Sequence, residues 1–326
     1  MAEEVWMLQT KKADFKQIGA RFRIDPVTAR IIRNRGIEGE AAIDRYLNGT
    51  LDDLYDPMLL KDMERAVSIL CEAVDTGKKI RIVGDYDIDG VCSTYILLQA
   101  FERLGSDVDF EIPDRIKDGY GINESIIEQA HADGVEVILT CDNGISAFHQ
   151  VELAKKYGMT VVITDHHEVP LDGEKEKIPP ADAVIDPKQA DCPYPSPEIC
   201  GAVVAYKLVQ VLYARRGVPR MEWLDLLEFA AIATVGDVMK LQDENRILVK
   251  YGLKKMAQTK NLGLRRLAEK NNLDLGAITA YHIGFVIGPC LNAGGRLKTA
   301  KEALALLRAQ SEEEAERYDA ALEPME

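Results

Sequence analysis

The amino-acid sequence predicts an α/β fold, a parallel sheet flanked by helices with additional helical segments at both ends of the chain. Two observations carry this prediction. Short runs rich in β-branched residues alternate with helix-like stretches of about a dozen residues, which is the spacing of βαβ units. Outside this alternation, apolar residues recur with helical periodicity. Strands joined through helices run parallel, so we expect their carboxyl ends along one edge of the sheet.

The elements can be followed in order along the chain. Residues 27–47 predict short helices, and residues 61–75 predict a longer one. The predicted strands are residues 79–84, 108–113, 135–141, 159–164 and 183–185. The helices predicted between them are residues 91–104, 124–132 and 145–157. We expect residues 170–199, which are rich in proline and charge, to be irregular, and the chain after Cys200 to be mostly helical.

Length, composition and cysteine usage exclude several classes of protein. At about 100–200 residues per domain, 326 residues make two domains or one large one. With 47% hydrophobic and 29% charged residues, the chain is globular rather than disordered. No apolar run approaches the roughly 20 residues of a membrane span, and the first residues lack a secretory signal pattern. Six cysteines form no Cys-x-x-Cys pair, so we expect reduced thiols, a cytoplasmic location and no membrane partner.

The charge of the chain is unevenly distributed. The net charge of −14 taken alone argues against a partner held by its phosphates. However, residues 11–35 carry +6 and residues 244–301 carry +8, so the remainder carries −28. Such blocks are either solvated helix faces or basic surfaces for a polyanion. Residues 302–326 are acidic with alanine and leucine at helical spacing, which predicts an exposed helix that connects to something further.

Carboxylates and histidines gather where the predicted strands end. The residues concerned are Asp85, Asp87, Asp89, Asp142, Asp165, His166 and His167, and Asp237 follows a later apolar stretch. Because ligands of open parallel sheets bind at the carboxyl edge, we expect the strand-end side chains to converge in space. Three carboxylates as close as Asp85, Asp87 and Asp89 repel one another unless cations neutralise them.

The donor types indicate the metal. Many carboxylates with one or two imidazoles and no thiolate suit Mn²⁺ or Mg²⁺ rather than structural zinc. Their number suits two ions with a bridging carboxylate, a recurrent arrangement for hydrolysis of phosphoryl esters. A calcium-binding EF-hand is excluded because Ile96 stands at the twelfth position of the loop and a strand precedes it. The sequence also lacks a phosphate-binding G-x-x-x-x-G-K-[ST] motif and a full dinucleotide fingerprint.

These motifs resemble the DHH phosphoesterase superfamily. The signature is Asp165-His166-His167 after a strand, with residues 85–90 (Asp-Tyr-Asp-Ile-Asp-Gly) and Asp142-Asn143-Gly144 upstream. Three further stretches are similar to the RecJ-type single-strand-specific exonucleases of that superfamily. They are residues 113–121, residues 191–202 and residues 288–297, the last of which contains Asn-Ala-Gly-Gly-Arg. The resemblance covers nearly the whole chain.

The resemblance implies a role for each candidate site residue. The implied metal ligands are Asp87, Asp89, Asp142, His166 and Asp237, with Asp142 as the bridge. The implied catalytic residues are His167 at the scissile phosphate, Asp165 as the group that orients His166, and Asp85 as a ligand or support. The implied substrate-binding residues are Asn292, Arg296 and Arg115. Many relatives have a histidine where this chain has Val83, so one metal site is either weaker or completed by Asp85 or water.

We therefore expect a metal-dependent 5′→3′ exonuclease that acts on single-stranded DNA in repair and recombination. The residues predict the reaction class, and the resemblance implies the direction and the strand preference. An alternative is a phosphodiesterase for oligoribonucleotides or cyclic dinucleotides. A pyrophosphatase leaves the basic N-terminal block and the Asn-Ala-Gly-Gly-Arg segment unexplained. A non-catalytic replication scaffold is disfavoured because such relatives tend to lose ligand carboxylates.

The resemblance also implies a domain organisation. Residues 1–45 would be a basic, mostly helical segment, and residues 46–300 the DHH phosphoesterase domain. Residues 301–326 would begin a connecting helix to a C-terminal DHH-associated domain that is absent from this sequence. Other repair proteins would bind through such absent domains.

Overall fold

The computed structural model describes residues 11–113, 121–297 and 300–322. The chain divides into two compact units, Met1–Leu54 and Tyr55–Glu326. The first unit contains α1 (Phe15–Phe22), α2 (Pro26–Asn34), α3 (Glu40–Asn48) and the 3₁₀ turn η1 (Leu51–Asp53). Helix α2 begins as the sequence predicts, because the Asp25 carboxylate accepts hydrogen bonds from the amides of Val27 and Thr28.

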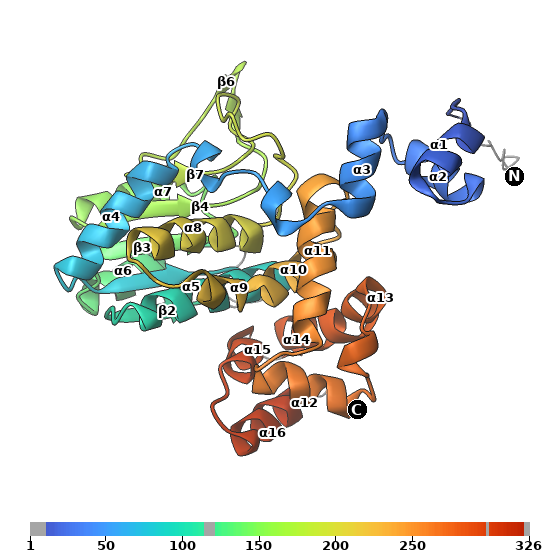
Figure 1. Cartoon of the computed structure of the whole chain (residues 1–326). Coiled ribbons are helices and arrows are strands. Elements are labelled where there is room, and N and C mark those ends of the chain that lie inside the picture. The colour runs from blue at the N-terminus through green and yellow to red at the C-terminus, as the bar shows by residue number, and fades with distance from the viewer. Residues whose placement is uncertain (1–10, 114–120, 298–299, 323–326) are drawn as a thin grey trace, which may run out of the picture. The chain divides into compact units, whose positions relative to one another are not determined.

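The second unit is built on a five-stranded parallel sheet (Figure 1). Its strands are β1 (Ile80–Val83), β2 (Val108–Glu111), β3 (Val137–Cys141), β4 (Thr160–Thr164) and β7 (Ala183–Ile185), in the order β2-β1-β3-β4-β7. Val83 pairs with Thr140, and Thr164 pairs with both Cys141 and Ile185. The carboxyl ends therefore lie along one edge, and the predicted α/β fold with a parallel sheet is confirmed.

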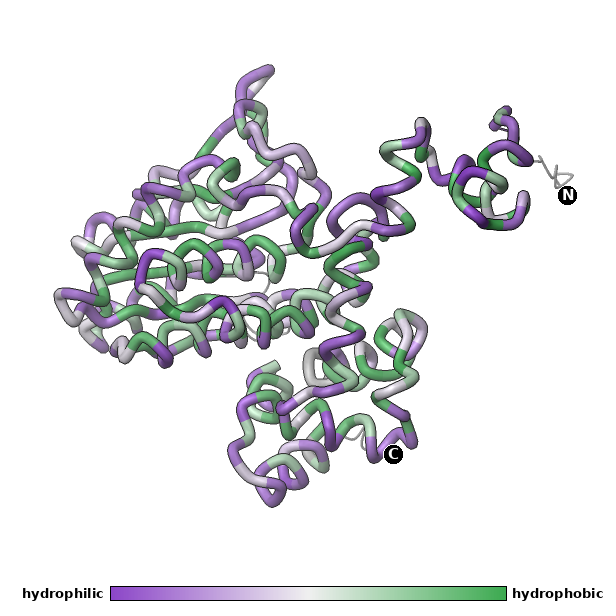
Figure 2. The backbone as a smooth tube through the Cα atoms, viewed as in Figure 1, coloured by the Kyte–Doolittle hydropathy of each residue, from purple (hydrophilic) through white to green (hydrophobic). Residues whose placement is uncertain are grey.

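Helices cover both faces of the sheet. Helices α6 (Glu124–Ala132) and α7 (Phe148–Lys156) pack on one face, over a core that includes Val161 and Ile163 of β4. Successive strand side chains alternate between faces, so Val162 belongs to the opposite side. That side carries α4 (Met63–Asp75), α5 (Ile88–Arg103) and α8 (Gly201–Arg215). Figure 2 shows hydrophobic residues running through the strands.

Among the remaining helices, α10 (Leu227–Gly236) packs on α5, α8 and α11 and is buried along most of its length. The others are α9 (Arg220–Leu224), α11 (Asp243–Met256), α12 (Leu262–Lys270), α13 (Ala280–His282), α14 (Gly288–Leu297), α15 (Ala300–Leu307) and α16 (Glu312–Ala321). Short turns are η2 (Pro57–Leu59), η3 (Leu275–Ala277) and the π-helical η4 (Ile283–Ile287). Among the residues that the structure describes, no helix has both the length and the apolar character needed to cross a membrane.

The structure differs from the predicted elements at several boundaries, such as the start of α7 at Phe148 rather than at residue 145, and in two segments. Helix α5 begins at Ile88 rather than at residue 91, because Asp87 caps its N-terminus by accepting from the amides of Asp89 and Gly90. The segment 170–199 is not wholly irregular, since it contains the hairpin β5 (Leu171–Asp172) and β6 (Lys175–Glu176). Residues 300–321 form two packed helices instead of one exposed helix.

Candidate metal centre

The acidic and histidine residues singled out in the sequence meet at the carboxyl edge of the sheet. Three overlapping groups each place their donor atoms within 4.8 Å of one another. The groups are Asp85, Asp87 and Asp142; Asp89, His166 and Asp237; and Asp142, His166 and His167. The expected convergence of the strand-end residues is thus observed. Asp165 belongs to none of the three groups but contacts His167, with 2.7 Å between its Oδ1 and His167 Nδ1.

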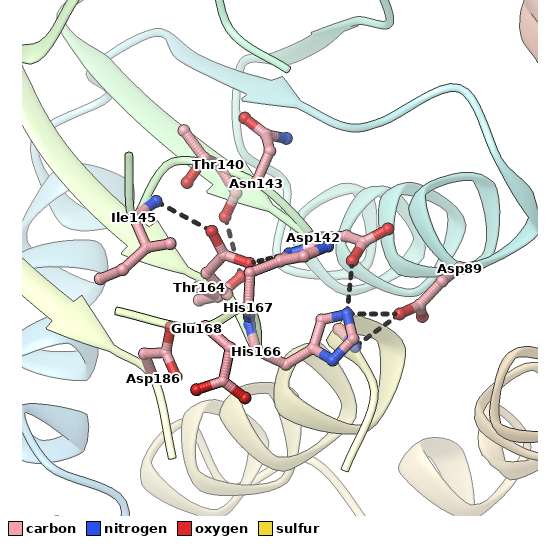
Figure 3. A network of polar contacts seen from close by, with 12 residues as sticks. Asp89, Thr140, Asp142, Asn143, Ile145, Thr164, His166, His167, Glu168 and Asp186 are labelled. Carbon is pink, nitrogen blue, oxygen red and sulfur yellow. Dashed lines mark hydrogen bonds and ion pairs between the residues drawn. The ribbon is translucent and has the colours of Figure 1, made fainter. Parts of the chain in front are cut away.

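His166 lies at the middle of these groups. Its Nε2 is 3.0 Å from Asp142 Oδ1, 3.4 Å from Asp89 Oδ2 and 3.9 Å from Asp237 Oδ2. Figure 3 shows the three side chains of Asp89, Asp142 and His166 pointing toward one another. Burial lowers the pKa of His166, which favours the neutral imidazole that binds metals. One nitrogen faced by three carboxylates is an arrangement that a divalent cation would stabilise.

Asp142 is held by an unusual backbone conformation. Its φ is +62°, in the left-handed region that non-glycine residues seldom adopt. Its amide nonetheless donates to the Thr164 carbonyl oxygen and so continues the pairing of β3 with β4. Burial, together with the charges of Asp89 and Asp87, raises the pKa of Asp142 well above its usual value. Strain of this kind and buried like charges are commonly found at functional sites.

Asp85 and Asp87 form the part of the cluster that follows β1. Burial and the neighbouring Asp87 raise the pKa of Asp85 to about 7. The Asp85 Oδ1 atom is buried and has no hydrogen-bond partner among the described residues. Gly90 permits the tight turn, because a Cβ there would lie 2.3 Å from the Asp85 carbonyl oxygen. Val83 packs into the hydrophobic core under α6 and α7, so its side chain does not face this cluster.

Asp89 is engaged by the first turn of helix α8. Its Oδ2 accepts from the Gly201 amide at 2.6 Å, and its Oδ1 accepts from the Ala202 amide at 2.7 Å. Cys200, Gly201 and Ala202 stood out in the sequence only through the family resemblance, which gave them no role. Contacts between residues so distant in sequence have no local signal that sequence reasoning could use.

Asp165 connects the loops that follow β3 and β4. Its Oδ2 accepts from the Ile145 amide at 2.8 Å, and its Oδ1 accepts from the His166 amide at 2.8 Å. The same Oδ1 lies 2.7 Å from Nδ1 of His167. The structure therefore differs from the expectation that Asp165 orients the His166 ring, since the ring that it holds is that of His167. The reason is geometric, because the His166 ring turns toward Asp89 and Asp142.

His167 faces a small cavity beside the cluster. The cavity has a volume of about 210 Å³ and is also lined by Asn143, Gly144 and Gln150. Burial opposes the protonated ring, but the hydrogen bond and charge of Asp165 outweigh it, so the pKa of His167 is raised. Asn143, which the sequence placed only as part of a motif, donates to the Val83 and Cys141 carbonyl oxygens. It thereby links β1 to β3 below the cluster.

The remaining candidates lie on the later helices or outside the described residues. Asp237 caps the C-terminus of α10, is partly exposed, and has a pKa raised to about 7 by burial and by Asp89. Asn292 lies in α14, and its buried Oδ1 has no hydrogen-bond partner among the described residues. The backbone of Arg296 belongs to α14, but its side chain lies outside the described part, as does all of Arg115.

The comparison with family models agrees with this geometry. Residues 79–234 match the model described as the DHH family, N-terminal domain. The matched stretch runs from β1 into α10 and includes every residue of the cluster except Asp237. The chain carries a DHH-family domain.

Curated proteins similar to this chain include RecJ proteins. It is 36% identical over 321 residues to the single-stranded-DNA-specific exonuclease RecJ of Bacillus subtilis, covering 98% of this chain and 39% of that one. The RecJ of Escherichia coli is 36% identical over 295 residues, covering 87% of this chain and 50% of that one. The DHH chain thus spans about half, or less, of the length of these relatives.

Solved structures similar to the DHH chain are RecJ structures as well. An exonuclease RecJ bound to manganese superposes with a TM-score of 0.72 at 34% identity, covering 81% of this chain and 65% of that one. RecJ of Thermus thermophilus in complex with Mn²⁺ gives a TM-score of 0.78 at 31% identity, covering 94% of this chain and 43% of that one.

Proposed function

We propose that this chain holds the catalytic centre of a metal-dependent 5′→3′ exonuclease that removes nucleotides from single-stranded DNA. The observation that carries the proposal is the convergence of five carboxylates on the His166 imidazole and on one another at the sheet edge. A cluster with so much negative charge fits a site for cations. The exonuclease names of the relatives support the choice of substrate.

The donor set fits two Mn²⁺ or Mg²⁺ ions. We assign Asp87, Asp89, Asp142, His166 and Asp237 as ligands, and Asp142 as the bridge because it is the carboxylate that belongs to two of the three groups. The buried Oδ1 of Asp85 has no hydrogen-bond partner among the described residues. Asp85 would therefore complete or support one of the two metal sites, the one at which many relatives have a histidine where this chain has Val83. Such a pair of ions supplies a hydroxide nucleophile and neutralises charge on the phosphate.

The two histidines would have separate tasks. His166 faces the carboxylates and would serve as a ligand. His167 is directed by Asp165 and would contact the scissile phosphate or donate a proton to it. A raised pKa suits both roles, since the imidazolium binds anions and carries the proton to be given. Asp165 would act as a positioning residue for His167.

The substrate would extend beyond the metal centre onto basic surface. Arg296, Asn292 and Arg115 would contact phosphates, and the block 244–301, with its charge of +8, would attract the strand. We retain the division into a basic N-terminal segment 1–45, a DHH domain 46–300 and a connecting segment 301–326 as part of the proposal. The cytoplasm fits the six free cysteines, and repair proteins are the proposed partners.

A nuclease assay with matched substrates tests the proposal. The chain is incubated with Mn²⁺ and 5′-labelled single strands, double strands or dinucleotides, and Asp142→Asn serves as the inactive control. We expect mononucleotides from the 5′ end of single strands only. Cleavage of dinucleotides alone would favour the short-oligonucleotide phosphodiesterase instead. Full activity of Asp142→Asn would contradict the proposed metal centre.

A further inference from the structure

The first turn of helix α8 is built against two of the proposed metal ligands at once. Gly201 donates its amide to Asp89 Oδ2, and Ala202 donates its amide to Asp89 Oδ1. On its other side, Gly201 lies so close to Asp142 that a Cβ would fall 2.7 Å from Asp142 Cβ and 2.8 Å from Asp142 Oδ1. All of these groups are buried. One glycine therefore touches two of the three carboxylates that face His166 Nε2.

The same turn also contacts α10, the helix capped by Asp237, which is the third carboxylate near His166 Nε2. Cys200, which precedes α8, has its Sγ 3.7 Å from the Thr234 hydroxyl oxygen in α10. Helix α10 ends at Gly236 and is capped by Asp237, three residues after Thr234. The start of α8 thus contacts Asp89 and Asp142 directly. Through the Cys200 side chain it also contacts α10, the helix that Asp237 caps.

We propose that Gly201 and Ala202 are positioning residues that set the orientation of Asp89 and its separation from Asp142, and so the metal affinity of the site. Two amides at the N-terminus of a 15-residue helix stabilise a buried carboxylate and fix its plane. Each oxygen of a carboxylate has a second lone pair, so a fixed plane leaves both oxygens able to bind a cation. The missing Cβ at position 201 lets Asp142 lie beside that plane. The inference rests on the metal centre proposed above.

Groups that orient metal ligands affect affinity strongly. Mutation of the hydrogen-bond partners of ligands commonly costs about 10- to 100-fold in metal affinity. Gly201→Ala would push Asp142 away without removing a donor. Ala202→Pro would remove the donor to Asp89 Oδ1, and proline is tolerated in the first turn of a helix. The two variants disturb different carboxylates of the same site by different means.

A matched control is available in the same unit. A Cβ at Gly263 in α12 would lie 2.2 Å from the Leu306 carbonyl oxygen in α15, so Gly263→Ala also introduces a steric clash in a buried helix interface. No residue of the metal centre is among its close neighbours. Gly263→Ala therefore reports what general destabilisation does to metal binding.

The experiment is calorimetric titration of Mn²⁺ into the whole chain and its three variants, with the Tm of each metal-free protein measured in parallel. We expect Gly201→Ala and Ala202→Pro to lose at least 10-fold in Mn²⁺ affinity, while Gly263→Ala loses less than 2-fold despite a lowered Tm. Wild-type affinity in both α8 variants, or an equal loss in all three, would overturn the positioning role alone. Absence of Mn²⁺ binding by the wild type would overturn the metal centre together with this inference.

Discussion

The carboxylate of Asp165 holds the ring of His167, with 2.7 Å between Oδ1 and Nδ1, while both oxygens of the carboxylate also accept backbone amides. The carboxylate is buried and cannot turn away without breaking these hydrogen bonds. The ring of His167 thus has a fixed direction beside the metal centre, and its function is open to test.

Asp165→Asn should lower kcat by about 100-fold or more, the usual range for loss of an oriented acid–base group. The amide cannot accept both the Ile145 amide and the His167 ring as the carboxylate does. His167→Gln should cost as much, and the double variant no more than either single one, because the two residues act as a unit. Additive losses in a steady-state assay would contradict the coupling.

Asp142→Asn should abolish hydrolysis and yet raise the Tm of the metal-free protein at pH 8. Removing one charge from a buried group of like charges relieves repulsion, an effect on the order of 1 kcal/mol. Differential scanning fluorimetry with and without Mn²⁺ measures both changes. The wild type should gain Tm when Mn²⁺ is added, and the variant should not. A lower Tm in the metal-free variant would refute the repulsion argument.

Glu228 in α10 should make stability depend on pH. Burial raises its pKa from the ordinary 4.5 to about 7, and its Oε2 has no hydrogen-bond partner among the described residues. The folded state holds the proton more tightly than the unfolded state. The folded state is therefore stabilised by protonated Glu228 to the full extent below about pH 4.5. This contribution to the free energy of unfolding is lost as the pH rises through about 7, a change on the order of 3 kcal/mol.

Urea unfolding from pH 4.5 to 8 of the wild type and Glu228→Gln would measure this dependence. The difference between their unfolding free energies should change across that range, because glutamine does not titrate. Parallel curves would show that Glu228 does not titrate in this range. Other groups titrate in both proteins and cancel in the difference.

Arg296→Ala should raise KM for single strands by about 10-fold and leave Mn²⁺ affinity nearly unchanged, since a guanidinium binds phosphate rather than the cation. Arg103→Ala is the matched control, because Arg103 pairs with Glu222 at the far end of α5 and lies outside the basic block. Equal effects of the two substitutions on KM would argue against a specific phosphate contact at Arg296.

The convergence of the site was predictable because it depends on topology alone. Parallel strands place Asp85, Asp142 and His166 at one edge whatever their side-chain conformations are. The partner of Asp165 and the engagement of Asp89 by α8 were not predictable, because each depends on how a ring or a distant helix packs. Two helix starts do have a signal in the local sequence, a residue type that commonly caps helices. Asp87 caps α5, and the Ser311 hydroxyl accepts from the Glu314 amide at the start of α16.

The position of Asp237 at the end of α10 has a consequence for the order in which the protein matures. The donor set begins at Asp85, and its last member follows only after the whole sheet and helices α8 and α10 have been made. A nascent chain on the ribosome would therefore lack a complete set of ligands until α10 has emerged and docked. Metal binding by the full donor set would then require a chain in which α10 has already packed on α5 and α8.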